Sequence, residues 1–222
     1  MTTLTIKYIA LILMLIDHIG YFFIPYEHNL YILFRGIGRL SAPLFWYCFS
    51  IGYLNTSNKK NYFNRLCLAT TITGTGNLLI DYFQTNTFSI YNFFDNNMFI
   101  VFILGILFLE GLNNIKKNIN SIFLLFISLF FSIILPGYKI IPLIIFAIFY
   151  YIKDYRKISV YYIISSIIFC LVMRNQLQLL MIFSLLIIFC DNHKKPKKKY
   201  KYFFYLFYTF HIWIFKILSG IY

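Results

Sequence analysis

Residues 4–24 read LTIKYIALILMLIDHIGYFFI, an apolar run that is interrupted by Asp17 and His18. A helix that spans a bilayer needs about 20 mostly apolar residues, and this run meets that length. It contains the charged residue Asp17 and is not followed by the small-x-small motif of a signal-peptide cleavage site. It is therefore expected to stay in the protein as a helix. The run therefore predicts a membrane helix that carries a buried carboxylate.

The composition favours lipid as the surroundings of the whole chain. Of 222 residues, 60% are hydrophobic, 22% aromatic and only 12% charged, whereas soluble domains carry roughly 25% charged residues. The net charge of +13 lies in short runs between apolar stretches, as in cytoplasmic membrane loops. Nucleic-acid binders instead present their charge on a folded polar surface, so no nucleic-acid partner is expected.

Hydropathy predicts an all-α fold: a polytopic membrane helix bundle with about nine transmembrane helices. Short connections favour antiparallel neighbours, and no internal repeat is evident, so residues 1–222 are expected to form a single integral membrane domain. The predicted spans lie near residues 4–24, 30–54, 63–83, 97–112, 119–135, 139–152, 158–173, 176–190 and 203–219.

The basic residues predict the orientation of the bundle. Alternate connections hold fifteen Lys and Arg on one side, and the opposite connections hold only Lys139 and Arg174. Because positive loops stay in the cytoplasm, the N-terminus is expected inside and the C-terminus outside, in a multi-pass protein of the inner (cytoplasmic) membrane. The run 193–201 is interpreted as a topology signal that also attracts anionic membrane lipids.

Four polar residues are expected in the outer half of the bilayer: Asp17, His18, Arg35 and Arg39. A charge at mid-bilayer costs about 2.5–3.5 kcal/mol on insertion scales, so such residues are usually paired or functional. Adjacent helix positions point about 100° apart, which places Asp17 poorly to orient His18. Asp17 is therefore expected to pair with an arginine of residues 30–54, leaving His18 to face a cavity.

Two further stripes extend this polar layer. Residues of 63–83 share one helix face at a four-three-four spacing, and His211 lies near mid-membrane on a face of 203–219. The members of these stripes and their outer neighbours are Thr70, Gly74, Asn77, Asp81, Asn97, Gln176, Gln178, Phe204, Tyr208, His211 and Phe215.

No metal or disulfide site is predicted. The histidines His18, His28, His193 and His211 lack ligand spacing. The cysteines lie far apart in apolar segments and are interpreted as small buried hydrophobes; they are Cys48, Cys67, Cys170 and Cys190.

Five stretches of the chain form recognisable motifs. They are Met14-Leu15-Ile16-Asp17-His18-Ile19-Gly20, Gly38-Arg39-Leu40-Ser41-Ala42-Pro43-Leu44-Phe45, Asn64-Arg65-Leu66, Asn97 and Phe207-Tyr208-Thr209-Phe210-His211. In this order along most of the chain they resemble the TraX family. The resemblance is weakest over residues 110–170, where only hydropathy matches.

This resemblance implies a membrane acyltransferase, similar in style to the acyltransferase-3 type, with acetyl-CoA as the donor. The family is named for a conjugation protein that acetylates the N-terminal amine of a pilin, so a peptide, a pilin-like protein or a glycan is a possible acceptor. Ser41-Ala42 stands where an aromatic residue often precedes the proline, which puts the acceptor's shape in doubt.

Under the activity that this resemblance implies, the polar residues would take the following roles. His18 or His211 would act as general base, with His18 preferred for its depth, and Arg39 or Asn97 would stabilise the oxyanion. Asp17 would hold the arginines, and Arg65 at the inner face would bind the phosphates of acetyl-CoA. The remaining substrate-binding candidates are Arg35, Asn77, Asp81 and Tyr208.

Two other functions stay open. A small-molecule or ion carrier would use the same buried Asp, Arg and His as substrate or proton sites, although carriers more often show repeats and broken helices. An assembly or immunity factor would use the buried charges only to hold its helices together.

Overall fold

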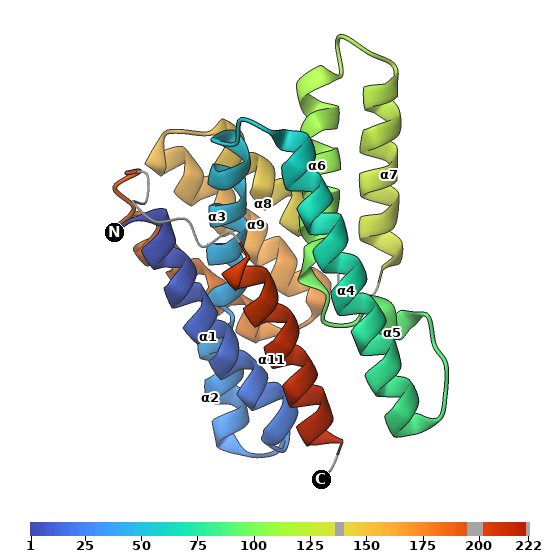
Figure 1. The fold of residues 1–222 in the computed structure, drawn as a ribbon. Coiled ribbons are helices and arrows are strands. Elements are labelled where there is room, and N and C mark those ends of the chain that lie inside the picture. The colour runs from blue at the N-terminus through green and yellow to red at the C-terminus, as the bar shows by residue number, and fades with distance from the viewer. Residues whose placement is uncertain (136–139, 195–201, 221–222) are drawn as a thin grey trace. The chain divides into compact units, whose positions relative to one another are not determined.

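The computed structural model describes residues 1–135, 140–194 and 202–220, and these residues form helices without a strand. The all-α prediction is therefore confirmed for this part of the chain. The helices, shown in Figure 1, are α1 (Thr3–Phe23), α2 (Asn29–Gly38), α3 (Ser41–Leu54), α4 (Lys59–Thr85), α5 (Tyr91–Phe94), α6 (Met98–Asn114), α7 (Asn120–Ile134), α8 (Ile140–Tyr151), α9 (Tyr155–Met173), the 3₁₀ helix η1 (Gln176–Phe183), α10 (Ser184–Ile188) and α11 (Phe203–Ser219).

These helices divide into two compact units. Unit 1 takes the described residues of 1–51 and 148–201, and unit 2 takes those of 52–147 and 202–222. The unit boundaries fall within α3, within α8 and between residues 201 and 202. The expectation that residues 1–222 act as one domain stays a prediction.

The helices occupy the ranges that hydropathy predicts, with two corrections. The expected span 30–54 is divided into α2 and α3 by a turn at Arg39–Leu40. Pro43 lacks a backbone N–H and suits the first turn of a new helix, which is its place in α3. The expected span 176–190 begins as 3₁₀ helix over Gln176–Phe183 and becomes α-helical only at Ser184.

In the described part of the chain, α1 and α9 are each long and apolar enough to cross a membrane, judged by length and composition. The shorter apolar helices, of 10–17 residues, are α6, α7, α8, the segment Gln176–Ile188 and α11, and the predicted spans 30–54 and 63–83 belong to neither group. The nine-span topology and the sides of the two termini stay predictions; Lys139 and most of the run 193–201 lie outside the described residues.

In unit 1, α1 and α2 lie side by side as a helical hairpin (Figure 1). Two glycines permit the close approach. A Cβ atom at Gly38 would lie 2.2 Å from Asp17 Cβ, and one at Gly20 would lie 2.8 Å from Phe34 Cβ. Small residues at such crossings let helix backbones pack closely, and here they bring Asp17 against α2.

In unit 2, α4 packs against α5, α6 and α11. The ring of Trp213 from α11 packs against Gly76, and the ring of Phe93 from α5 packs against Gly74. The buried side chains of α4, α6 and α11 include Leu66, Leu109 and Ile212, which have at most 1% of their surface exposed. One face of α4 therefore lies against α5, α6 and α11.

The cysteines differ in part from the prediction. Cys48 and Cys170 are buried as expected, Cys67 is half-buried, and Cys190 is exposed. Cys190 lies just after the end of α10. All four carry free thiols.

Candidate functional site

Unit 1 contains a buried ion cluster formed by Asp17, Arg35 and Arg39, here called the Asp17 cluster. Arg35 Nη1 lies 2.6 Å from Asp17 Oδ2, and it also reaches the Asp17 carbonyl oxygen at 3.4 Å. Arg39 Nη2 lies 4.0 Å from Asp17 Oδ1. The three side chains are only 14–18% exposed. The expected ion pair between Asp17 and an arginine is confirmed, and its first partner is Arg35.

Helical geometry explains this arrangement. Arg35 and Arg39 are four residues apart and so share one face of their segment, and Gly38 removes the side chain that would separate Asp17 from α2. The Arg35 guanidinium also lies over the Tyr21 ring, 5.1 Å from its centroid. Asp17 is therefore directed to α2, as predicted, while the half-buried His18 has the Phe22 ring edge-on at 6.1 Å.

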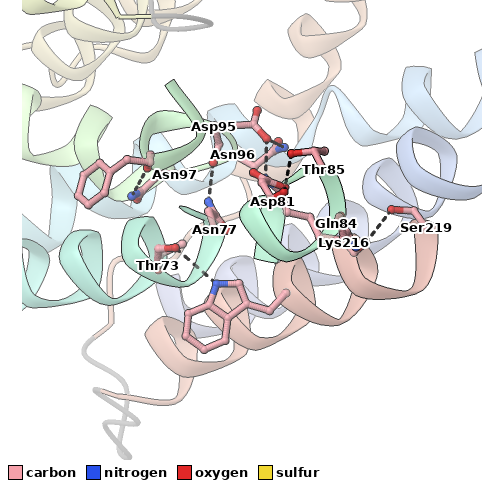
Figure 2. Close-up of polar contacts among 12 residues, drawn as sticks. Thr73, Asn77, Asp81, Gln84, Thr85, Asp95, Asn96, Asn97, Lys216 and Ser219 are labelled. Carbon is pink, nitrogen blue, oxygen red and sulfur yellow. Dashed lines mark hydrogen bonds and ion pairs between the residues drawn. The ribbon is translucent and has the colours of Figure 1, made fainter. Parts of the chain in front are cut away.

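Unit 2 contains the predicted polar face of α4. Thr70, Gly74 and Asn77 are buried, and Asp81 is partly buried at the end of the stripe. Asn77 donates to the Asp95 carbonyl at 2.7 Å, as Figure 2 shows. The stripe thus holds the segment that leads into α6.

Asn97 is fully buried at the start of α6. Its side-chain amide nitrogen donates to the carbonyl oxygens of Thr70 at 3.0 Å and Phe93 at 3.3 Å. These bonds use the same amide group that an oxyanion would need. In this structure, Asn97 therefore positions the segment that precedes α6.

Lys216 of α11 was not among the candidates, yet it is the centre of an ion cluster in unit 2. Its Nζ lies 2.8 Å from Asp81 Oδ2 and 3.0 Å from Asp95 Oδ2, and its side chain is 7% exposed (Figure 2). Gln84 also donates to the Lys216 carbonyl at 2.9 Å. A lysine inside the apolar stretch 203–219 was the sequence signal that could have found this cluster, because buried charges need partners.

Tyr208 and His211 lie on the buried side of α11. The Tyr208 hydroxyl donates to the Asn96 carbonyl at 2.6 Å and accepts from Met98 N–H at 3.3 Å, so it caps the N-terminus of α6. His211 Nδ1 lies 2.9 Å from the Phe207 carbonyl oxygen. A carbonyl only accepts, so Nδ1 carries the proton in this bond and a neutral ring has its lone pair on Nε2.

Arg65, the proposed donor-binding residue, lies in α4 with its guanidinium 5.6 Å from the centroid of the Tyr62 ring. In the same unit Glu110 accepts from Lys59 at 2.7 Å and from Asn114 at 3.1 Å, and also from the Tyr53 hydroxyl. Sequence reasoning missed this cluster because it treated Lys59 only as a topology signal.

A second missed carboxylate, Asp191, lies in unit 1. It accepts from the hydroxyls of Tyr47 at 2.8 Å and Thr3 at 3.1 Å, and from the His193 backbone N–H at 3.1 Å. Tyr47 and Thr3 are far from Asp191 in sequence, so no local pattern predicted these two contacts. Gln178, proposed for the outer polar layer, is buried in η1, whereas Gln176 is exposed.

The predicted site residues are thus brought together as two sets. Asp17, His18, Arg35 and Arg39 belong to unit 1, while Arg65, Asn77, Asp81, Asn97, Tyr208 and His211 belong to unit 2. The single polar layer that sequence analysis predicts for both sets stays a prediction. Among the described residues, no group of three or more His, Cys, Asp or Glu side chains is placed to hold a metal ion.

The fold and these clusters define an all-helical protein whose apolar helices enclose paired charges, an arrangement typical of membrane proteins. The chain belongs to the TraX family: the family model described as TraX protein matches residues 3–219. The predicted resemblance to that family is confirmed, and the similarity to acyltransferases of the acyltransferase-3 type stays a prediction. Searches of curated proteins and of solved structures each gave no match.

Proposed function

We propose that this protein is a membrane-embedded acyltransferase of the inner (cytoplasmic) membrane that moves acetyl from acetyl-CoA to an amine or hydroxyl. The observation that carries this proposal is the TraX match over residues 3–219. The acceptor is proposed to be a membrane or extracytoplasmic molecule, such as a peptide, a pilin-like protein or a glycan.

The reaction needs one base and one oxyanion stabiliser. The acceptor's nitrogen or oxygen attacks the thioester carbonyl while the base takes its proton. The tetrahedral intermediate then breaks its carbon–sulfur bond, and the coenzyme leaves as a thiolate that takes up a proton. General base catalysis contributes about 10²–10⁴ in rate, and removing one oxyanion donor costs about 10²–10³.

Unit 1 supports one version of this site, with His18 as the base. Arg39 is the residue that follows α2, and its Nε makes no hydrogen bond to any described residue, so this guanidinium is able to stabilise an oxyanion. Asp17 supports the arginines and takes no part in proton transfer.

Unit 2 supports the other version, with His211 as the base. The bond from Nδ1 to the Phe207 carbonyl fixes the ring and presents Nε2 as the basic atom. Tyr208, whose ring centroid lies 5.4 Å from that of His211, is the neighbouring substrate-binding candidate, and Asn77 and Asp81 are further candidates in the same unit. Asn97 is the weaker oxyanion stabiliser, because its amide group already donates to two carbonyls.

The deciding experiment measures initial rates of acetyl transfer against acetyl-CoA concentration for purified His18→Ala and His211→Ala. The variant that removes the base should lose about 10²–10⁴ in rate, and the other should lose less. His28→Asn is the matched control, because His28 is exposed and caps α2 by accepting from Leu30 N–H, and asparagine keeps a capping acceptor. Near-normal rates in both alanine variants would reject a histidine base.

Arg65→Ala tests the donor site separately. If Arg65 binds the phosphates of acetyl-CoA equally in the ground and transition states, the variant should raise KM with little change in kcat. A fall in kcat at saturating acetyl-CoA would instead assign Arg65 to the chemical step.

A carrier is the second candidate, and the break between α2 and α3 favours it. Transporters place binding sites at discontinuous helices, and here the break at Arg39–Leu40 adjoins the Asp17 cluster. Turnover of labelled acetyl-CoA by the purified protein separates the two functions. An assembly or immunity factor would show neither turnover nor substrate uptake into proteoliposomes.

A further inference from the structure

The Asp17 cluster carries more positive than negative charge. Asp17 supplies one carboxylate, whereas Arg35 and Arg39 each supply a guanidinium that stays charged in proteins. The acidic residues in the described part of unit 1 are Asp17, Glu27, Asp154 and Asp191. Of these, Asp17 alone lies within 4.0 Å of either arginine, so one positive charge remains in the cluster.

Geometry assigns that excess charge to Arg39. Arg35 has three interactions, with the Asp17 carboxylate at 2.6 Å, the Asp17 carbonyl and the Tyr21 ring. Arg39 approaches Asp17 only to 4.0 Å, which is too long for a hydrogen bond. Its Nε atom is buried and makes no hydrogen bond to the described residues.

The surrounding backbone does not remove this charge. Arg39 lies where the C-terminal end of α2 meets the N-terminal end of α3. Helix ends carry partial charges of opposite sign, so the two contributions oppose each other. Arg39 shares the single carboxylate of Asp17 with Arg35, so part of its buried charge stays uncompensated. Such a charge is costly, and a bound anion would offset that cost.

We infer that Arg39 binds an oxyanion, a carboxylate or phosphate group, whose source is a small molecule or a lipid headgroup. A guanidinium presents parallel N–H groups that match the oxygens of such an anion. Arg39 Nε makes no hydrogen bond to the described residues, and Nη2 beside it reaches Asp17 only at 4.0 Å. This inference concerns the charge of unit 1 alone, so it holds whether or not the chain transfers acetyl.

The test measures the thermal unfolding midpoint of the purified full chain against probe concentration at constant ionic strength. The probes are inorganic phosphate, acetyl-CoA, and nanodiscs of phosphatidylglycerol compared with phosphatidylcholine. A ligand that binds the folded state raises the midpoint with concentration. A response to phosphate indicates a small anion, a response to acetyl-CoA alone indicates the donor, and a response to phosphatidylglycerol alone indicates a lipid.

Arg39→Gln should weaken the binding of whichever probe stabilises the wild type by about ten- to hundredfold. This is the range expected for the loss of a hydrogen bond to a charged group. This variant leaves the pair of Asp17 and Arg35 neutral, so it should fold. Arg39→Lys should keep part of the response, because it keeps the charge. Arg156→Gln is the matched control, since Arg156 is an exposed arginine of unit 1 without an ion pair to the described residues.

Arg35→Gln provides a second neutral cluster, in which Arg39 is able to move onto Asp17, and it should lose the response as well. The inference is overturned if none of the three probes stabilises the wild type. It is also overturned if Arg39→Gln responds as strongly as the wild type. Acetyl-transfer rates do not enter this measurement, so its failure is distinct from failure of the proposed enzyme.

Discussion

Asp17→Asn is expected to be the most destabilising single change in the Asp17 cluster. The substitution removes the carboxylate 2.6 Å from Arg35 and 4.0 Å from Arg39, so two largely buried guanidinium groups lose their common partner. Removing one member of a buried ion pair costs about 3–5 kcal/mol. The exposed acid Glu27 supplies the control, and Glu27→Gln should change the unfolding free energy by less than about 0.5 kcal/mol.

The net charge of the cluster predicts how much unfolding free energy the other variants lose. Arg35→Gln should cost less than Asp17→Asn, because Arg39 is close enough to replace Arg35 beside Asp17. The double variant Asp17→Asn with Arg35→Gln leaves a single excess charge, as in the wild type. It should therefore recover about 2–3 kcal/mol relative to additivity.

The assay is reversible unfolding in mixed micelles with increasing dodecyl sulfate, followed by far-UV circular dichroism. The double-mutant cycle gives the coupling free energy between Asp17 and Arg35. Additivity within about 0.5 kcal/mol would show that the two side chains do not interact. A larger loss for Arg35→Gln than for Asp17→Asn would refute the argument from charge.

Two further predictions concern unit 2. A cysteine placed at Asn58 should be protected from an impermeant thiol reagent in intact cells and one at Asn86 labelled, because basic residues predict these sides; the reverse pattern would invert the topology. Lys216→Met should strand the carboxylates of Asp81 and Asp95 and lower the unfolding free energy by about 3–5 kcal/mol in the same micelle assay. A loss below about 1 kcal/mol would show that this lysine is not their necessary counter-charge.

Much of the candidate site was predictable because its signals are local. Helical spacing placed Thr70, Gly74 and Asn77 on one face, and the structure buries all three. The cost of a charge in lipid required a partner for Asp17, and the structure provides Arg35. The clusters around Lys216, Glu110 and Asp191 escaped prediction because their partners come from distant parts of the chain.

The amino-acid sequence by itself determined the all-helical class, the approximate ranges of the helices and membership of the TraX family. These properties depend on hydropathy and periodicity within single segments, which neighbouring residues express without tertiary contacts. Only the tertiary structure decided that Arg35, and not Arg39, makes the short contact to Asp17, that the segment 30–54 breaks at Arg39–Leu40, and that Lys216 joins two aspartates. Such choices depend on how closely two helices approach, and Gly38 shows that a single missing Cβ atom can decide that distance.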